Sequence, residues 1–281
     1  MAEKPEPGVC DVDIVPEGAY EIVPSELKSR LKRIIQYGKD TGIIIPVFLY
    51  GPPGVGKSAI ASEIAVELGM DLHTFIASTM DPTEIRGIPV PMTEEKEKYS
   101  EWYPQRQWVE GMGNTNIYFF DELNLATQAT QAAFYRLILE GKLDTIDISR
   151  AARIAAGNRK EDVSTIKAMP MPLTTRFEIY YIKAEAKSWL DWARKNDIDE
   201  NVIGYIEEHP GQIFCTNKTK PDVAKATPRS WTRVSQLLKV GLNTKEDIAG
   251  SIGFDPANKF LAYMAKKPER KIPNLGTEEI L

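Results

Sequence analysis

The chain has 281 residues and a net charge of −5; 42% of its residues are hydrophobic and 27% are charged. This length and composition allow one large α/β domain and a smaller one, whereas the acidic balance gives no overall attraction to nucleic acid or to anionic lipid. No run approaches the roughly 20 apolar residues of a membrane span, and two cysteines (Cys10 and Cys215) with two histidines argue against a zinc site.

The first residues are predicted to form an arm. Residues 1–24 contain four prolines and many charged side chains, a composition typical of an extended segment rather than of a core element. They also lack the apolar core of a signal peptide, so we expect a protein of the reducing cytoplasm. A helix is expected from residue 25 to Ile35, and the apolar run Ile43–Tyr50 is expected to be a strand.

A glycine-rich loop follows that strand. It reads Gly-Pro-Pro-Gly-Val-Gly-Lys-Ser and fits the pattern G-x-x-x-x-G-K-[ST], whose backbone N–H groups surround the phosphates of a nucleotide. The next segment has apolar residues at helical spacing, so strand, loop and helix occur in the order that the pattern requires. The candidate nucleotide-binding residues are Gly51, Pro52, Pro53, Gly54, Val55, Gly56, Lys57, Ser58 and Ala59.

An insertion interrupts the pattern between residues 85 and 108. It follows a second expected strand, Leu72–Ala77, and contains prolines, a charge run and three aromatic residues, Trp102, Tyr103 and Trp108. We interpret it as an exposed hairpin or loop. Two readings of the aromatic residues remain open: they grip a partner or line a pore, or they pack on the flank of the sheet.

A second motif gives the glycine loop its chemistry. The apolar run Ile117–Phe120 is typical of a buried parallel strand, and Asp121 and Glu122 follow at its end, where ligands bind in open α/β sheets. Lys57 is expected to contact the β- and γ-phosphates of the nucleotide. Ser58 and Asp121 are the candidate Mg²⁺ ligands, and Glu122 is the candidate that polarises the attacking water. The sequence therefore predicts a Mg²⁺-dependent nucleoside-triphosphate hydrolase.

Three more candidate catalytic residues follow in chain order. A helix over Thr127–Leu139, a hairpin at residues 142–153 and a core strand lead to Asn158, whose amide could orient water against the γ-phosphate. Arg176 lies just before another strand, and Arg229 opens a later helix. An arginine from a neighbouring subunit can stabilise transferred phosphoryl charge, and an arginine on a mobile lid can report the γ-phosphate.

Taken together, these motifs resemble those of AAA+ ATPases of the MoxR group, which are related to dynein- and midasin-type modules. The resemblance covers residues 25–265. In the terms of that family, Gly51–Ser58 is similar to Walker A, Phe120–Asn124 to Walker B, Ala156–Asn158 to sensor 1, Thr175–Phe177 to the arginine-finger segment and Thr227–Arg229 to sensor 2. The finger segment departs from the family pattern, since Thr174 and Thr175 stand where an acidic residue is commoner.

The resemblance implies a fold and a domain division. An AAA+ αβα domain with a central parallel sheet would span residues 25–183, with inserted hairpins at about 85–108 and 142–153. A smaller, all-helical lid would span 184–281. The resemblance also implies ATP as the nucleotide, a homo-oligomeric ring of six subunits with nucleotide between them, and a protein client, often with a von Willebrand A-type partner.

Alternatives remain open at this point. The chain could be the motor subunit of a nucleic-acid-directed machine, as in McrB-like relatives, although acidic charge and the missing DNA-binding domain argue against it. The basic residues that this reading would use are Lys218, Lys220, Lys225, Arg229 and Arg233. A nucleotide-switched scaffold and a small-molecule kinase are disfavoured by the complete set of hydrolytic motifs and by the helical C-terminal region.

Overall fold

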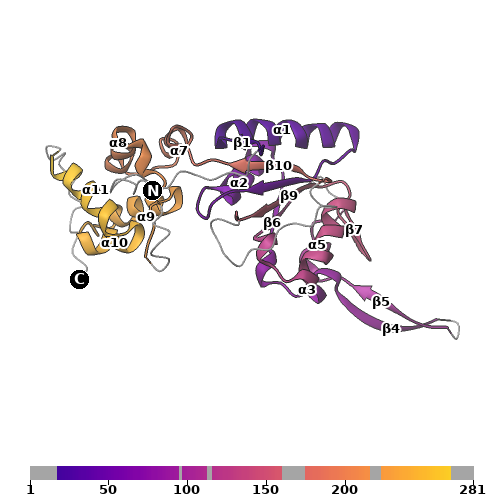
Figure 1. The fold of residues 1–281 in the computed structure, drawn as a ribbon. Helices are drawn as coiled ribbons and strands as arrows, with labels where there is room; N and C mark the ends of the chain where they lie inside the picture. The colour runs from indigo at the N-terminus through magenta and orange to yellow at the C-terminus, as the bar shows by residue number, and fades with distance from the viewer. Residues whose placement is uncertain (1–17, 95–96, 113–115, 160–174, 216–222, 267–281) are drawn as a thin grey trace, which may run out of the picture.

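The computed structural model describes residues 18–94, 97–112, 116–159, 175–215 and 223–266, and they form a layered α/β domain followed by a group of helices (Figure 1). The domain is built on a six-stranded parallel sheet in the order β1-β10-β2-β9-β6-β3. Its strands are β1 (Glu21–Ile22), β2 (Val47–Tyr50), β3 (Leu72–Ile76), β6 (Ile117–Asp121), β9 (Ala152–Gly157) and β10 (Glu178–Ile182). This confirms the predicted fold class.

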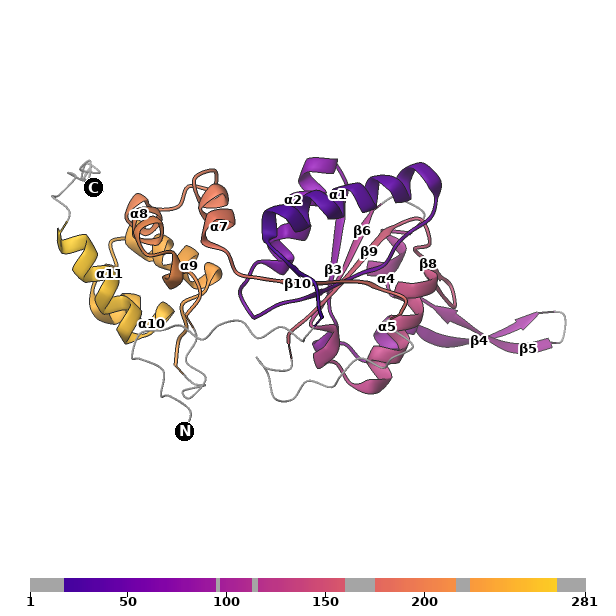
Figure 2. The ribbon, with the colours of Figure 1, turned by 45° about the horizontal axis from the view of Figure 1, so that its top comes forward.

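Helices cover both faces of the sheet, which explains why the central strands are almost continuously apolar, with Arg153 in β9 and Asp121 at the end of β6 as charged exceptions. On one face, α1 (Pro24–Thr41) and α2 (Lys57–Leu68) pack on side chains such as Leu49 and Phe119. On the other, α3 (Pro82–Arg86), α4 (Arg106–Val109) and α5 (Gln128–Glu140) pack on Phe48 and Phe120. Figure 2 shows α1 and α2 on one side of the sheet and α5 on the other.

The N-terminal segment enters the sheet earlier than expected. The sequence placed residues 1–24 in an extended arm, of which residues 1–17 lie outside the described part of the chain. Glu21–Ile22 instead forms an edge strand parallel to β10, and Ile22 is buried in the core beneath α1. A two-residue strand is too short to produce a visible alternation, so periodicity could not reveal it.

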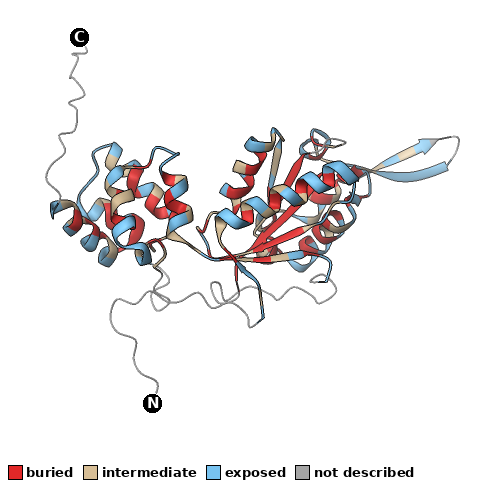
Figure 3. Ribbon diagram, turned by 90° about the horizontal axis from the view of Figure 1, so that it is seen from above, coloured by how far each residue is buried: buried red, intermediate tan, exposed pale blue. Residues whose placement is uncertain are grey.

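The insertion contains an antiparallel hairpin, β4 (Ile88–Glu94) and β5 (Glu97–Tyr103), which we call the β4–β5 ribbon. It projects from the domain, and most of its residues are exposed (Figure 3). Its base contacts a second hairpin, β7 (Lys142–Leu143) and β8 (Ile146–Asp147). The Arg86 guanidinium lies 4.3 Å from the ring centroid of Trp102 and bonds Asp144 at 3.0 Å. Thr145 donates its hydroxyl to the Trp102 carbonyl at 3.1 Å.

The aromatic residues of the insertion divide between the two readings left open above. Trp108 is fully buried, stacks on Phe75 with ring centroids 4.0 Å apart and donates its indole N–H to the Glu84 carbonyl. Tyr103, in contrast, is half exposed at the base of the ribbon, and Trp102 is partly covered by Arg86. Packing on the sheet therefore accounts for Trp108, whereas the other two belong to the ribbon.

The C-terminal part of the described chain is a helical group with its own core. It contains α7 (Ala186–Ala193), α8 (Glu200–Glu208), α9 (Pro228–Lys239), α10 (Lys245–Ile252) and α11 (Phe254–Lys266). Its core is aromatic: Tyr205, Trp231 and Phe260 meet with ring centroids 5.3 to 5.5 Å apart. None of the described helices is both long and apolar enough to span a lipid bilayer.

Candidate functional site

The glycine loop leaves the carboxyl end of β2 and turns directly into α2. Gly54 and Gly56 have positive φ angles of 81° and 105°, a conformation that residues with a Cβ rarely adopt, so glycine is required at both positions. Helix α2 begins at Lys57, and the positive end of its dipole therefore lies at the loop. Backbone donors and helix dipole together favour an anion such as a phosphate group at this place.

Lys57 is held inside the loop. Its side chain is 92% buried, and its ammonium group donates hydrogen bonds to the carbonyls of Gly51 at 2.7 Å and Pro52 at 3.2 Å. A third bond, at 3.1 Å, reaches Oδ1 of Asn158 at the end of β9. The three acceptors are neutral, and they hold the ammonium group at the loop.

Ser58 and Asp121 are adjacent, as the sequence predicted. The Ser58 hydroxyl donates to Oδ2 of Asp121 at 2.8 Å, while Oδ1 of Asp121 accepts the Glu122 backbone N–H at 2.9 Å. A hydroxyl and a carboxylate oxygen are ligands that Mg²⁺ prefers, and Mg²⁺ usually binds one or two carboxylates together with substrate phosphates. This donor set beside a phosphate loop fits that ion. The described residues contain no cluster of three or more His, Cys, Asp or Glu side chains that would hold a metal by themselves.

Glu122 follows Asp121 in an unusual backbone conformation. Its φ of 55° lies in the left-handed region, which is uncommon for a residue with a Cβ. Its carboxylate accepts a hydrogen bond from the hydroxyl of Ser78 at 2.5 Å. Ser78 lies in a short 3₁₀ turn after β3, the neighbouring strand of the sheet. The sequence analysis did not single out Ser78, because no local pattern marks a contact between residues 44 positions apart.

Asn158 is placed where the sequence predicted, at the end of β9 between β2 and β6. It is buried, and its side chain faces Lys57. Its backbone is bonded at both polar groups by Asn124, which follows Glu122 by two residues. The sequence analysis included Asn124 within the Walker B segment and gave it no role.

The helical group contacts the glycine loop through the start of α9. Arg229 donates its backbone N–H to the Gly54 carbonyl at 3.3 Å. A Cβ on Gly54 would lie 2.8 Å from the Thr227 hydroxyl, so the close approach depends on glycine at that position. Thr227 also caps α9 by accepting the Ser230 N–H, and Pro228 occupies the first turn. The Arg229 side chain is exposed beside the loop.

Arg176 lies away from the loop of its own chain. Its side chain is exposed just before β10, whose Glu178 pairs with Val47 and whose Tyr181 pairs with Tyr50. The loop leaves the sheet after Tyr50, whereas Arg176 precedes the opposite end of the same strand pair. The offset from Arg176 to Tyr181 corresponds to roughly 16 Å along the strand direction. The fold therefore does not bring Arg176 together with the other candidate residues of one chain.

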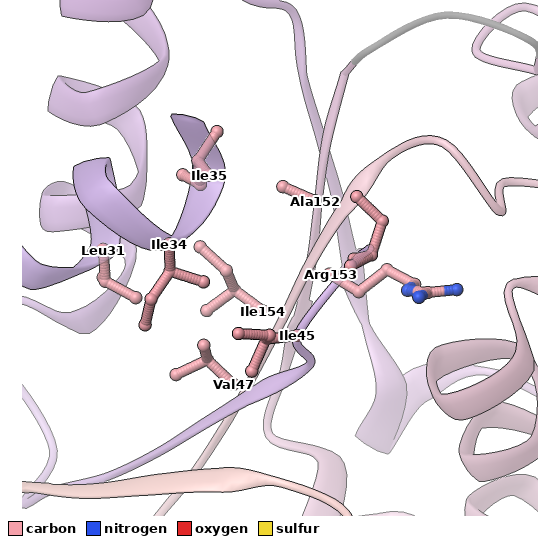
Figure 4. A pocket seen from close by; sticks show the side chains of 9 residues that line it. Leu31, Ile34, Ile35, Ile45, Val47, Ala152, Arg153 and Ile154 are labelled. Atoms are coloured by element: carbon pink, nitrogen blue, oxygen red, sulfur yellow. The ribbon is translucent and has the colours of Figure 1, made fainter. Parts of the chain in front are cut away.

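Tyr50, the aliphatic pocket and the basic residues considered above add no further member to the candidate site. Tyr50, the last residue before the loop, stacks on Tyr181 with centroids 5.0 Å apart, and burial raises the pKa of its hydroxyl, which stays neutral. The pocket in Figure 4 lies at the other end of the sheet and is lined by aliphatic side chains of α1, the segment before β2 and β9. Of the basic residues considered for nucleic acid, Lys218 and Lys220 lie outside the described residues, as does Cys10.

The glycine loop follows β2, Asp121 and Glu122 lie at the end of β6, Asn158 follows β9 between these two strands, and the helical group contacts the loop. This arrangement is that of a P-loop nucleotide-binding domain of the AAA+ fold. The family described as AAA domain (dynein-related subfamily) matches residues 46–176. Residues 46–176 are therefore similar to an AAA domain of this subfamily, and the fold is that of a P-loop ATPase.

Comparison with known proteins agrees at this level. The chain is 27% identical over 124 residues to the Holliday junction branch migration complex subunit RuvB of Treponema denticola, covering 43% of this chain and 30% of that protein. It is 26% identical over 186 residues to midasin of Giardia intestinalis, covering 57% of this chain and 4% of midasin. The matches thus span about a third or less of these relatives.

The same fold occurs in solved structures. A mutant of RuvB from Thermotoga maritima superposes with a TM-score of 0.51 at 18% sequence identity, covering 87% of this chain and 71% of that one. At this identity the likeness shows the fold. It includes the helical group, because the coverage exceeds the length of the α/β domain.

Proposed function

We propose that this chain is an ATP-hydrolysing AAA+ ring ATPase of the MoxR type, which remodels or assembles a protein client in the cytoplasm. The observation that supports this proposal best is the pairing of a complete hydrolytic set with the exposed β4–β5 ribbon on one rigid domain. A hydrolase alone does not need a projecting two-stranded element, which is marginally stable without a partner.

The chemistry divides among the residues already described. The loop backbone and Lys57 bind and orient the phosphates, and Ser58 and Asp121 hold Mg²⁺. When bound, Mg²⁺ neutralises charge that develops on the phosphoryl oxygens. Glu122 accepts a proton from the attacking water and orients it, and Asn158 presents its amide beside the γ-phosphate. In the structure, one of the two carboxylate oxygens of Glu122 already accepts the hydroxyl of Ser78.

A ring explains the position of Arg176. Its guanidinium lies too far from its own loop, so we propose that it contacts the nucleotide of the neighbouring subunit and stabilises phosphoryl charge there. Arg229 is proposed to sense the γ-phosphate from the lid, a role supported by the contact between its backbone and Gly54. These two assignments imply that nucleotide binds at subunit interfaces. The expected number of six subunits comes from the resemblance to the MoxR group.

The β4–β5 ribbon is proposed to act on the client. Arg86 links it to the β7–β8 hairpin through Trp102 and Asp144, and we propose that the two hairpins act together. The Walker B strand and α5 connect that unit to the nucleotide site. A von Willebrand A-type protein is the partner that we propose to test first.

A second candidate is the motor subunit of a nucleic-acid-directed machine. The similarity to RuvB, named as a branch migration subunit, favours it. The net charge of −5 opposes it, because nonspecific binding to DNA relies on neutralising phosphates with lysine and arginine.

The rate of ATP hydrolysis distinguishes the two candidates. Steady-state turnover is measured with Mg²⁺ across protein concentrations, with a purified von Willebrand A-type protein that co-purifies with the native ring, and with duplex DNA at about 50 and 200 mM salt. Stimulation by the protein partner supports the proposal. Stimulation by DNA that falls steeply with salt supports the alternative, and absent turnover at every concentration rejects both.

A further inference from the structure

We infer that Asn124 is a positioning residue for the hydrolytic step: it fixes the backbone of Asn158 and thereby sets where the Asn158 side chain meets Lys57. Its Nδ2 donates to the Asn158 carbonyl at 2.7 Å. Its Oδ1 accepts the Asn158 backbone N–H at 3.1 Å. Two bonds from one planar amide to both polar groups of a single residue fix its orientation as well as its position.

Burial and a close contact with Gly157 restrict the Asn124 side chain to one orientation. The residue is 97% buried, so its amide cannot exchange these partners for water without loss. Gly157, the residue before Asn158, lies directly against it: a Cβ there would be 2.5 Å from Oδ1 of Asn124 and 2.7 Å from its Cγ. Gly157 has no positive φ angle, so its lack of a side chain is explained by this close approach and not by the backbone.

The contact leads directly to the phosphate loop. Asn158 bonds Lys57 through Oδ1, and Gly157 accepts the Gly51 N–H through its carbonyl at 3.4 Å. The end of β9 therefore touches the loop at two points, and Asn124 holds that strand end from the Walker B side. A shift of Asn158 by about 1 Å would misplace its amide, and such misplacements cost roughly 10²-fold in rate.

A purely structural role would look different. Asn116, at the other end of β6, is also buried and donates Nδ2 to the Gly111 carbonyl at 3.3 Å. It lies near His73, with 3.2 Å between Nδ2 and Nε2, and contacts no residue of the proposed site. Asn116 therefore provides a matched control: it is a buried asparagine just before β6, as Asn124 is one just after it, and its loss is expected to affect stability alone.

The inference rests on the proposed catalytic role of Asn158. The experiment is designed so that the role of Asn158 and the role of Asn124 can be rejected separately. Three variants are made in the full-length protein: Asn124→Asp, which keeps the shape and loses the donor to the Asn158 carbonyl; Gly157→Ala, which displaces the Asn124 amide from the other side; and Asn116→Ala. For each, kcat, the affinity for a fluorescent ATP analogue and the melting temperature are measured.

We expect Asn124→Asp and Gly157→Ala to lower kcat at least about tenfold with little change in nucleotide affinity. Asn116→Ala should lower the melting temperature and leave kcat unchanged. In an Asn158→Ala background, Asn124→Asp should cause no further loss of kcat, because the residue acts through Asn158.

The results that would contradict these expectations are distinguishable. Full activity of Asn158→Ala would reject the catalytic assignment of Asn158 and this inference with it. A strong effect of Asn158→Ala together with normal kcat in Asn124→Asp would overturn the inference alone. So would independent, multiplicative losses in the double variant, or loss of kcat in Asn116→Ala as large as that in Asn124→Asp.

Discussion

The hydroxyl of Ser78 bonds the carboxylate of Glu122 at 2.5 Å, across the gap between two neighbouring strands of the sheet. Glu122 is the proposed base for the attacking water, and this bond engages one of its two carboxylate oxygens. We therefore expect the bond to compete with the proposed role of Glu122.

The first prediction follows from that competition. Ser78→Ala removes the bond and should raise basal ATP turnover by about 2- to 10-fold, the rate equivalent of one hydrogen bond. Thr79→Ala is the control, since Thr79 is the exposed neighbour and bonds only the Ile76 carbonyl among the contacts described. A fall in turnover in Ser78→Ala would mean that Ser78 holds Glu122 in its productive position.

Binding and chemistry should be separable. Glu122→Gln is expected to bind ATP normally and to hydrolyse it at least about 10²-fold more slowly, because the amide cannot accept the proton of the attacking water. Lys57→Ala should lose nucleotide binding, because the buried ammonium group is the charged contact inside the loop. Isothermal titration and a steady-state assay check both. Near-normal turnover in Glu122→Gln would remove this residue from the chemical step.

The ribbon should matter for the client more than for folding. Replacing Trp102 and Tyr103 with Ala is expected to leave the melting temperature and basal turnover nearly unchanged while reducing stimulation by the co-purified partner. The control is Trp108→Ala, which should cost about 3–5 kcal/mol because that ring is fully buried. A comparable loss of stability in the double variant would show that the ribbon aromatics are structural.

Activity should depend on subunit contact. Arg176→Ala should keep its affinity for ATP and lose turnover by roughly 10³- to 10⁵-fold, as for arginine fingers in other phosphoryl-transfer systems. Mixing it with Lys57→Ala should restore part of the activity, because some interfaces then pair an intact loop with an intact arginine. If the mixture stays inactive while subunits demonstrably exchange, the assignment across subunits fails.

Arg153 allows a test of stability. It is buried at the start of β9, its side chain points away from the aliphatic pocket (Figure 4), and Nε and Nη1 have no hydrogen-bond partner. Burial lowers its pKa from the usual arginine range to about 10, so the folded state binds this proton more weakly than the unfolded state. The charge therefore destabilises the fold at neutral pH, and the penalty shrinks as pH rises above about 10.

Arg153→Met should accordingly raise the free energy of unfolding at pH 7 by about 1–4 kcal/mol. Arg136→Met is the control: that arginine is exposed and pairs with Glu140 four residues on, so its loss should change stability by less than about 0.5 kcal/mol. Denaturant titration of both variants provides the measurement. A less stable Arg153→Met would show that the guanidinium has favourable contacts in the assembled protein.

The sequence predicted the parts of the site that depend on local chain order. Asp121 ends one apolar strand, and Lys57 and Ser58 follow the glycine loop that leaves another. Because parallel strands bring their carboxyl ends to one edge, the proximity of these residues followed from the pattern. Ser78 and Asn124 could not be assigned roles in the same way. Their partners are 44 and 34 residues away, and the bonds depend on strand order and on glycine at position 157.

For the fold too, the sequence predicted features that depend on local pattern and not those that depend on long-range packing. Long apolar runs predicted the central strands, whereas the edge strand at Ile22 is too short to carry a period. The insertion was recognised by its prolines and charges, but composition alone could not tell that Trp108 lies in the core while Trp102 lies in the ribbon. That distinction depends on the turn at Pro104, which ends β5 and returns the chain to the sheet.

The prolines of the β4–β5 ribbon also bear on aggregation. Pro89 and Pro91 alternate along β4, so both ring nitrogens face the same edge, and an intact ladder with β5 requires that this edge be the outer one. On the opposite edge, the Trp102 carbonyl is already bonded by Thr145. A projecting ribbon with unpaired edges would invite strand pairing between neighbouring molecules. The prolines remove amide donors from this edge, so in the proposed ring the ribbons of neighbouring subunits would not pair into a continuous sheet.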